Sequence, residues 1–496
     1  MPIDYSQAAR LAYLQWLDAV DSAELEWIRT LRDYAVGDHP TYLTDRQKEF
    51  IGLLPKNTDH LFSHNLCALI IATVAERMAV TGFSTADADE ASADQTPLAL
   101  AASHWWETNR MDALQDDLYE AALRDGSAYL IVDWDPIAKA PRWYLNDAFD
   151  GTTGVQMFYD PETGSPMFAA KRWVMDARMG GDLAGLTRLT LYFPDRVERY
   201  VQRTGKGRAD DAIDNELMRL NWRTYRDAPG EEWPRPWVDS SGAPLGMPAI
   251  AFDNPGGSEI ESVVSLQDLL NKSDLDLIAA ADHSGFRILY ASGLQPTLDS
   301  SGEEQAITLS PGHLLRITDP QGKLGAVEPG DLTRMIDTCH YWIESIAAQS
   351  RTPHHVLIPP RSDQPSGAAL KEQEVGLLSK CERKARAWGN AWEDVLYLSA
   401  RLSNTYGGTA MDLSERLQTQ WSAIQPASEK EHAEIAALKQ AAGVAAEMTW
   451  AEDLGMTAAE IERNLALKED AQQRQMATFG AVAARAARLR DQGMEV

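Results

Sequence analysis

One apolar stripe, kept for more than thirty positions, constrains the fold of this chain more than any other feature. Its members step by three, four or seven residues and so return to the same side of a helix: Leu370, Leu377, Cys381, Trp388, Trp392, Val395 and Ser399. Ser366 precedes the stripe and is the predicted N-cap of this helix. At about 1.5 Å per residue the helix reaches roughly 50 Å, which is long enough to cross a domain.

Two further predicted helices precede the long one and bracket an insert of about 45 residues. The first spans 258–284 and begins at a capping box, Ser258 to Glu261, which satisfies backbone donors at both ends of the motif. The second spans 331–350, where apolar residues recur at spacings of three and four. Glycine and proline punctuate strand-like runs between the two helices, so a small β structure is predicted over 287–328.

The helix predicted over 258–284 has two chemically different sides. At about 100° per residue, one side collects valine and leucine, and the opposite side collects four acids: Glu261, Asp268, Asp276 and Asp282. The whole segment contains six acids and one lysine. One side is therefore predicted to pack and the other to form an acidic stripe. An ordinary solvent-exposed helix surface has the same pattern, and the residues alone do not choose between the two interpretations.

A polar, proline-rich break separates the second helix from the long one. The stretch from Arg351 to Glu374 holds four of the chain's 24 prolines and two of its 10 histidines. Thr352 and Pro353 are predicted to end the second helix, because the residue before a proline is driven out of helical geometry. Such a break is either a solvated connection or a functional loop. The side chains in it that suit contacts with phosphate or groove edges are His354, His355, Arg361 and Gln364.

The adjacent histidines do not predict a metal site. Neighbouring side chains point in different directions in most backbones, and only Asp363 supplies a carboxylate nearby. A basic cluster follows on the long helix: Lys380, Arg383, Lys384 and Arg386. Because three acids share that helix, ion pairs along it or between subunits are favoured over contacts with DNA: Glu372, Glu374 and Glu382.

The first 250 or so residues are predicted to form an α+β domain. Helical periodicity covers 5–35 and 59–80, and a helix pair is predicted at 97–124. An Asp-Gly turn then leads into a strand at 124–134, and short strand candidates continue to about residue 252.

The end of the chain has a different character. A last strand-like run, 416–424, precedes Pro426, and two more capping boxes lie at 428–431 and 457–460. A small helical domain is therefore predicted over 428–496. Because 496 residues exceed one ordinary core, the expected fold class is α+β multidomain.

Composition narrows the possible environments and partners. There are 46 Lys and Arg against 74 Asp and Glu, which gives a net charge of −28. A chain this acidic repels nucleic acid at long range, so it is not expected to wrap tightly around DNA, although DNA can still slide past it. The three cysteines lack the spacing of a zinc site or a disulfide framework and are expected to be buried thiols in a reducing compartment. Neither a signal peptide nor a membrane span is predicted.

No catalytic motif of the GxSxG, HExxH or GxxxxGK[ST] type occurs in the chain, so neither an enzyme nor a cofactor is predicted. Two alternatives stay open. One is a multidomain metal-dependent hydrolase whose acids are scattered in the β-rich part, for example Asp133, Asp135, Asp160 and Asp195. The other is a helical scaffold or adaptor protein without a channel.

Five segments, taken in order along the chain, resemble the portal proteins of tailed bacteriophages, the head-tail connectors of the long-tailed group. They are "HNLCALIIATVAERMAVTGF" (64–83), "NRMDALQDDLYEAALRDGSAYLIVDWDP" (109–136), "NPGGSEIESVVSLQDLLNKSDLDLIAAA" (254–281), "SRTPHHVLIPPRSDQPSGAALKEQE" (350–374) and "LKQAAGVAAEMTWAEDLGMTAAEIER" (438–463). Each segment is weak alone, but their order is specific and spans nearly the whole chain.

The resemblance implies the architecture of a portal subunit. Its parts are an α/β wing over 1–255, a stem helix over 256–286, a small β-containing clip over 287–328, a second stem helix over 329–351, a tunnel loop over 352–366, a return to the wing with its long helix and strand over 367–427, and a helical crown over 428–496. It also implies a cyclic ring of about twelve subunits.

The resemblance further implies a function at one vertex of the capsid. Double-stranded DNA is packaged through the ring by a separate terminase motor and is later ejected, and head completion, tail, major capsid and scaffolding proteins bind the ring. Such a protein is assembled in the bacterial cytoplasm, resides in the virion and has no membrane partner. The implied site residues are His354, His355, Arg361, Asp363 and Gln364 in the tunnel loop, Glu261, Asp268, Asp276 and Asp282 on the channel wall, and Arg287, His313, Arg316 and Lys323 in the clip, where the terminase large subunit and the adaptor dock.

Overall fold

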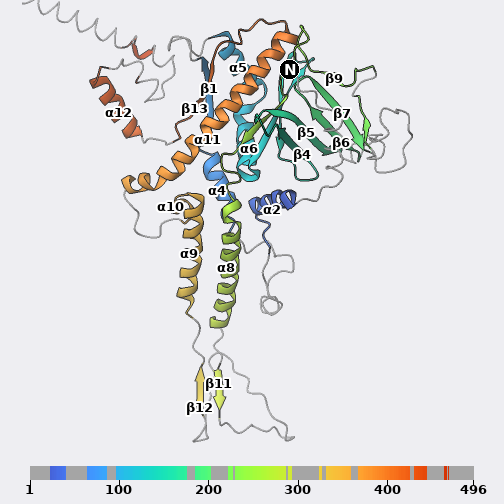
Figure 1. Cartoon of the computed structure of the whole chain (residues 1–496). Coiled ribbons are helices and arrows are strands. Elements are labelled where there is room, and N and C mark those ends of the chain that lie inside the picture. Colours follow the sequence, from blue (N-terminus) through green and yellow to red (C-terminus); the bar gives the residue numbers. More distant parts are fainter. Residues whose placement is uncertain are drawn as a thin grey trace, which may run out of the picture. The chain divides into compact units, whose positions relative to one another are not determined.

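The computed structural model describes residues 23–40, 64–85, 96–175, 185–202, 222–226, 230–285, 289–292, 323–326, 331–358, 367–424, 429–443, 449, 463–465 and 467. The chain divides into two compact units, Met1–Ile424 and Gln425–Val496. Each unit is described below by itself (Figure 1).

Helices make up the N-terminal part of the first unit: α2 (Ala23–Val36), α4 (Leu66–Ala75), α5 (Pro97–Thr108) and α6 (Met111–Asp125). The predicted helix pair at 97–124 is confirmed. Within the described residues, the helix predicted to run to residue 80 ends earlier, at Ala75. Its start is fixed by Asn65, whose side-chain oxygen accepts a hydrogen bond from the Ala68 amide at 3.1 Å.

A three-stranded antiparallel sheet follows α6 and has the order β10-β2-β3. Its strands are β2 (Ser127–Asp135), β3 (Ala140–Asp147) and β10 (Ala249–Asp253). The predicted Asp-Gly turn is confirmed, because Gly126 has φ 90°, which ends α6 and directs the chain into β2. The central strand β2 is buried on both faces over Ala128–Val132, so its sequence is a continuous apolar run rather than an alternating one.

A second antiparallel sheet has six strands, in the order β4-β5-β6-β7-β8 with β9 beside β7. They are β4 (Gly154–Tyr159), β5 (Pro166–Val174), β6 (Thr187–Tyr192), β7 (Arg196–Gln202), β8 (Trp222–Thr224) and β9 (Arg235–Pro236). One face carries an apolar core that includes Phe168, Leu189 and Trp222, to which Leu25 of α2 contributes. The strands and helices of this unit confirm the predicted α+β class.

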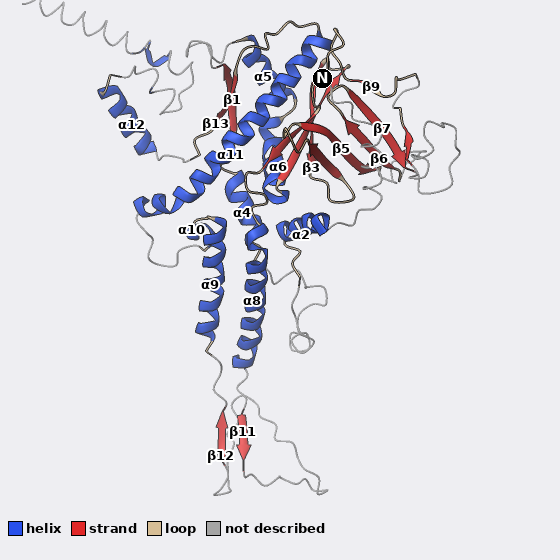
Figure 2. Ribbon diagram, in the orientation of Figure 1, coloured by secondary structure: helices blue, strands red, loops and turns tan. Residues whose placement is uncertain are grey.

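The long helix α11 (Gly367–Leu402) has 36 residues and packs on β10 and β2 (Figure 2). The predicted stripe is buried at the positions the structure describes, from Leu377 to Ser399. Its tryptophans also satisfy their polar ends: Trp392 donates to the Tyr119 hydroxyl at 2.8 Å, and Trp388 donates to the Asp253 carbonyl at 3.0 Å. The predicted N-cap, Ser366, lies outside the described residues.

A two-stranded sheet joins distant parts of the chain. β1 (Val80–Thr85) pairs antiparallel with β13 (Leu417–Trp421), so the last strand of the first unit lies beside the strand that follows α4. The strand-like run at 416–424 is thereby confirmed. Its partner β1 is not, because helical periodicity was expected to continue to residue 80 and no strand was predicted there.

Two helices, α8 (Val264–Gly285) and α9 (Leu332–Ser350), lie side by side and antiparallel (Figure 1). Between them in sequence, β11 (Leu289–Ser292) pairs with β12 (Lys323–Ala326) and confirms the strands predicted at the two ends of the insert. The capping box predicted at Ser258 is wrong. A 3-10 turn, η2 (Glu261–Val263), precedes α8, and the Ser258 hydroxyl accepts from the Ile260 amide at 3.3 Å rather than from the Glu261 amide.

Among the described residues of the second unit, helix α12 spans Glu429–Ala441. It agrees with the helical character predicted for 428–496. Ser428 and the second capping box, at 457–460, lie outside the described residues.

Candidate functional site at the base of the paired helices

A buried ionic cluster joins α11 to the segment in front of α8. Lys384, which is only 1% exposed, donates to the Glu259 carboxylate and to the Asn254 side-chain oxygen. Lys380 donates to the other oxygen of Glu259 at 2.7 Å and to the carbonyl of Ser350, the last residue of α9, at 2.8 Å. One carboxylate therefore holds two cations, and the cluster ties the base of both paired helices to α11.

The pKa values in this cluster follow from burial and pairing. Burial alone would raise the pKa of Glu259, but the charges of Lys380 and Lys384 outweigh it and hold the pKa below its usual range. For Lys384 burial is the larger effect, so its pKa is lowered in spite of Glu259. The basic cluster predicted on α11 is thus partly confirmed as a set of structural ion pairs. The predicted pairing along the helix is wrong for Lys380 and Lys384, because both bind Glu259, which lies outside α11.

The segment after α9 is more ordered than a loop. Arg351 ends α9 with φ 52°, and residues His354–Leu357 form a short helix, α10, inside the segment predicted as the tunnel loop, 352–366. Thr352 and Leu357 are buried. His355 lies 3.5 Å from Glu374 of α11, which also lies 3.6 Å from Arg77 at the end of α4. His355 is thus half-buried beside Glu374 of α11, whereas His354 is exposed.

The other tunnel-loop candidates, Arg361, Asp363 and Gln364, lie outside the described residues. So do three of the clip candidates, Arg287, His313 and Arg316. Lys323 begins β12, but its side chain also lies outside the described part. The roles of all seven residues stay predictions.

The acids predicted along α8 have different surroundings. Glu261 is exposed in η2. The Asp268 carboxylate accepts a hydrogen bond from the Tyr34 hydroxyl, and Asp276 pairs with Lys272 at 2.7 Å. The side chain of Asp282 lies outside the described residues. Whether these acids line a channel stays a prediction, but two of the four already have partners within the chain.

One side of α8 carries buried polar residues that were not predicted from the sequence. Gln267 is 0% exposed and contacts the His64 carbonyl, and Asn271 is 5% exposed and contacts the His39 ring. Asp274, one turn further, pairs with His64 at 2.8 Å. The signal in the sequence was an amide at positions i and i+4 of an otherwise apolar side, which is unusual for a helix that packs only through apolar contacts.

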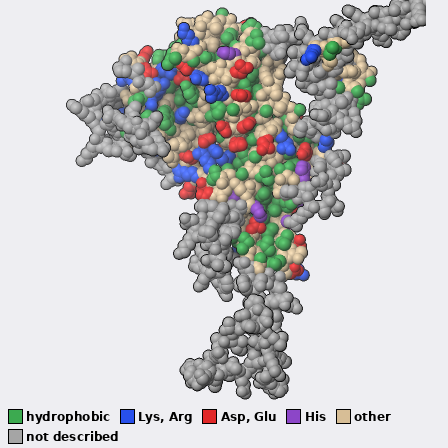
Figure 3. Space-filling view, turned by 180° about the vertical axis from the view of Figure 1, so that it is seen from behind, with side chains coloured by type: hydrophobic (Ala, Val, Ile, Leu, Met, Phe, Trp, Pro, Cys, Tyr) green, Lys and Arg blue, Asp and Glu red, His purple; other side chains and the backbone are tan. Residues whose placement is uncertain are grey.

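Apolar side chains stay exposed on the paired helices. Leu269 of α8 is 41% exposed, and Ile336 and Tyr341 of α9 are 37% and 58% exposed. Figure 3 shows hydrophobic side chains gathered over this part of the molecule. Within one chain the two helices already pack on each other, and Trp342 donates to the Ser273 hydroxyl at 3.1 Å. Surface is therefore left over for a further partner.

The acids of the hydrolase alternative do not come together. Asp133 binds Arg235 through both carboxylate oxygens at 3.1 Å, while Asp135 and Asp160 accept backbone amides of their own turns. Asp195 pairs with Arg196 at 3.0 Å. Among the residues that the structure describes, no group of three or more His, Cys, Asp or Glu is arranged to hold a metal ion. Cys67, Cys339 and Cys381 are buried free thiols, as predicted.

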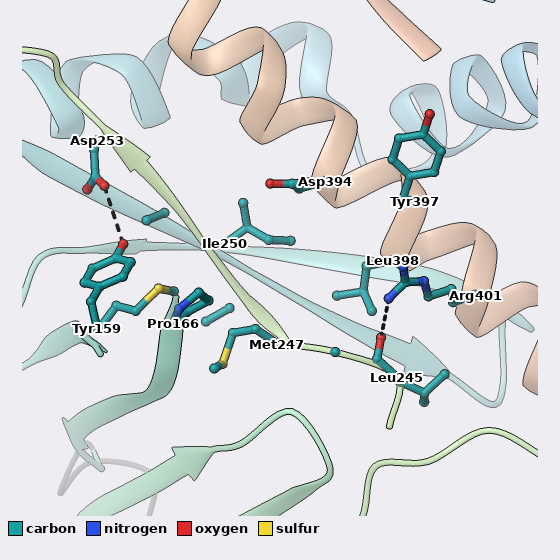
Figure 4. Close-up of a pocket in the computed structure, with 14 residues that line it drawn as sticks. Tyr159, Pro166, Leu245, Met247, Ile250, Asp253, Asp394, Tyr397, Leu398 and Arg401 are labelled. Carbon is teal, nitrogen blue, oxygen red and sulfur yellow. Dashed lines mark hydrogen bonds between the residues drawn. The ribbon is translucent and has the colours of Figure 1, made fainter. Parts of the chain in front are cut away.

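A pocket of about 330 Å³ opens between β4, β10 and α11 (Figure 4). Its lining combines apolar side chains such as Met247 and Ile250 with polar groups. Its polar groups are partly engaged: Tyr159 donates to Asp253 at 3.5 Å, and Arg401 donates to the Leu245 carbonyl at 3.1 Å.

The described residues of the first unit thus form an α+β body, a pair of antiparallel helices with a strand pair between them in sequence, and a long helix tied to the base of that pair. The chain matches the family described as "Phage portal protein, SPP1 Gp6-like" over residues 14–474, and it belongs to that family. It is similar to the portal protein of Mycobacterium phage D29, with 25% identity over 405 residues, and to that of Mycobacterium phage L5, with 24% identity over 389 residues. Each match covers 77% of this chain and 73% of the relative.

Membership of this family is consistent with a structural role in the bacteriophage capsid rather than with an enzyme. Among the described helices, none combines the length and the apolar character that crossing a bilayer requires.

Proposed function

We propose that the protein forms a ring at one vertex of the capsid, and that double-stranded DNA is packaged and later ejected through its centre. In this proposal α8 and α9 form the stem around the channel, 287–328 is the clip, and 428–496 is the crown. The terminase large subunit drives packaging at the clip, and head completion and tail proteins later attach there. Major capsid and scaffolding proteins contact the ring from outside, and assembly takes place in the host cytoplasm.

The exposed apolar surface of the paired helices is the observation that carries the proposal. Leu269, Ile336 and Tyr341 lie on helices that already bury one side against each other. A second apolar side on such a pair requires another partner, and identical neighbours in a closed ring supply it without leaving an unpaired end. Family membership supports the same arrangement.

The charge of the chain suits a conduit. Residues 258–284 carry six acids and one lysine, and Glu259 is already neutralised by Lys380 and Lys384. The remaining acids include the exposed Glu261. Repeated about twelve times around a channel, such a wall repels a polyanion from every side, so that the duplex slides without adhering.

In the tunnel loop we assign different roles to the two adjacent histidines. His355 is held by Glu374 and serves as an anchor in this proposal. The exposed His354, together with Arg361, Asp363 and Gln364, is assigned to the side that meets DNA. Arg287, His313, Arg316 and Lys323 are assigned to motor and adaptor docking in the clip.

A charge reversal at the channel wall tests the proposal. Glu261→Lys should leave subunit folding and ring assembly intact, because Glu261 is exposed. Heads assembled with it should hold less DNA, since each subunit then repels the duplex less and presents one lysine that can bind phosphate. The matched control is Glu162→Lys, an exposed acid in the turn between β4 and β5. DNase-protected DNA per head is the measurement. Equal filling by both variants would contradict the assignment of α8 and η2 to the channel wall.

A further inference from the structure

A chain of hydrogen bonds with only one consistent direction fixes α8 to the segments around α2 and α4. At one end the Gln267 amide nitrogen donates to the His64 carbonyl at 2.6 Å, and the Gln267 oxygen accepts from the Leu66 amide at 3.2 Å. A carbonyl only accepts and a backbone amide only donates. The orientation of the Gln267 side-chain amide is therefore set by the backbone.

That orientation dictates the next two side chains. The same Gln267 nitrogen donates to the Asn271 oxygen at 2.9 Å, so the Asn271 nitrogen must point the other way, towards His39. It lies 2.9 Å from Nδ1 of His39. Because an amide nitrogen only donates, Nδ1 of His39 must accept, and it therefore carries no proton.

The other ring nitrogen of His39 completes the chain. Nε2 lies 3.1 Å from the Tyr34 carbonyl, to which it must donate. His39 is thus a neutral imidazole with its single proton on Nε2, and its ring stacks on Tyr34 with centroids 4.7 Å apart. His39, Asn271 and Gln267 are all buried, so water does not replace a bond that is lost.

We propose that His39, Asn271 and Gln267 form an acid-sensitive joint, which holds the first half of α8 against α2 and α4 and opens when His39 takes up a proton. A proton on Nδ1 would face the Asn271 amide hydrogens. Turning the Asn271 amide to relieve this contact would place its nitrogen against the Gln267 nitrogen, and turning Gln267 as well would break its bonds to His64 and Leu66. Protonation of His39 alone therefore disrupts the whole series of hydrogen bonds from His39 to Gln267.

The surrounding charges act in opposite directions on the two histidines near this joint. Burial lowers the pKa of His39, although the Tyr34 carbonyl and the nearby Asp268 and Asp38 oppose the shift. Its neutral form is thus stable down to a pH below the ordinary value of 6.5. The pKa of His64 is instead raised, chiefly by its hydrogen bond to Asp274, so protonation of His64 as pH falls strengthens this pair rather than breaking it. Acid should therefore release α8 at His39 while the His64 contact persists.

Two substitutions separate the joint from ordinary packing. His39→Gln keeps one donor and one acceptor but takes up no proton in this pH range. Asn271→Asp keeps the acceptor for Gln267 and presents a second acceptor to His39, so it favours protonated His39. His39→Gln should remove the loss of stability that the joint causes as pH falls. Asn271→Asp should turn that loss into a gain. His104→Gln, at an exposed histidine of α5, is the control and should leave the pH profile of the wild-type protein unchanged.

The measurement is stability of the full chain between pH 7.5 and 5.5, compared between variants at each pH. A group whose pKa is lower in the folded state costs stability as pH falls below its unfolded value. The folding equilibrium constant of wild type should therefore fall relative to that of His39→Gln, by at most about tenfold at pH 5.5. Hydrogen exchange should show loss of protection confined to residues 264–277 in wild type, with α6 as the internal reference.

Two results would overturn the proposal. One is an identical pH profile for wild type and His39→Gln. If His39→Gln fails to fold, the second variant decides, because the stability of Asn271→Asp relative to wild type must rise as pH falls. A constant or falling difference would show that the direction of the hydrogen-bond chain does not control the joint. The joint lies within one chain and does not require the ring proposed above, so this outcome is independent of the portal function.

Discussion

Replacing Glu259 by glutamine should destabilise the base of the paired helices more than replacing either lysine that binds it. In wild type one Glu259 oxygen accepts from Lys384 and Asn254, and the other accepts from Lys380. A glutamine turns one of these acceptors into a donor, which then faces an ammonium group. It also leaves two cations without a counter-charge, at side-chain exposures of 2% and 12%.

The expected magnitudes follow from what each change leaves behind. Removing one partner of a buried ion pair costs about 3–5 kcal/mol, and Glu259→Gln belongs at this level because both lysines lose their charge partner. Lys384→Met leaves Glu259 paired with Lys380 and strands chiefly the Asn254 oxygen, which costs about 1–3 kcal/mol. Because the cluster is buried, added salt should change these differences little.

Native-state hydrogen exchange of α11 measures this difference directly, as the free energy of opening for amides around Lys384. The difference between wild type and Glu259→Gln should be largest near neutral pH. The pKa of Glu259 is lowered in the folded state, so its contribution is present above the unfolded value of 4.5 and is lost as pH falls through the folded value. A Lys384→Met variant that is less stable than Glu259→Gln would refute this account of the cluster.

Three further outcomes follow from the structure. Deleting residues 359–365 should leave rings intact and reduce the DNA packaged per head, and failure of rings to form would show that this segment belongs to assembly rather than to the bore. Tyr341→Asp should prevent rings in size-exclusion chromatography with light scattering while the subunit stays folded, whereas Ile137→Asp, at a 93% exposed turn residue, should not. Gly154→Ala should lower the melting temperature, because Gly154 has φ 119° and an added Cβ would lie 2.4 Å from the Ala148 carbonyl oxygen.

The sequence predicted features whose signal is local and periodic. The stripe along α11, the helix pair at 97–124 and the strands that flank the insert all follow from spacing within one segment. The predicted length of α11, roughly 50 Å, agrees with its 36 residues because a helix rises by about 1.5 Å for each of them.

Features that depend on distant partners were not predictable from spacing. Lys384 was assigned to acids on its own helix because Glu259 lies 125 positions away, and only the fold brings the two together. Asp268 was assigned to an open stripe because nothing near it in sequence identifies Tyr34 as its donor. The contact of His355 with Glu374 at 3.5 Å was not predicted either, and a role of His355 at the DNA stays a prediction. Burial of Gln267 and Asn271 likewise depends on segments that precede them by about two hundred positions.

The mass and shape of the purified protein test the central claim most directly. Native mass spectrometry together with cryo-electron microscopy should show a closed ring of about twelve subunits with a central opening, at about twelve times 54.9 kDa. The exposed apolar sides of α8 and α9 should then be buried between neighbouring subunits. A monomer or a stable dimer without a central opening, in which Leu269, Ile336 and Tyr341 stay exposed, would contradict the account.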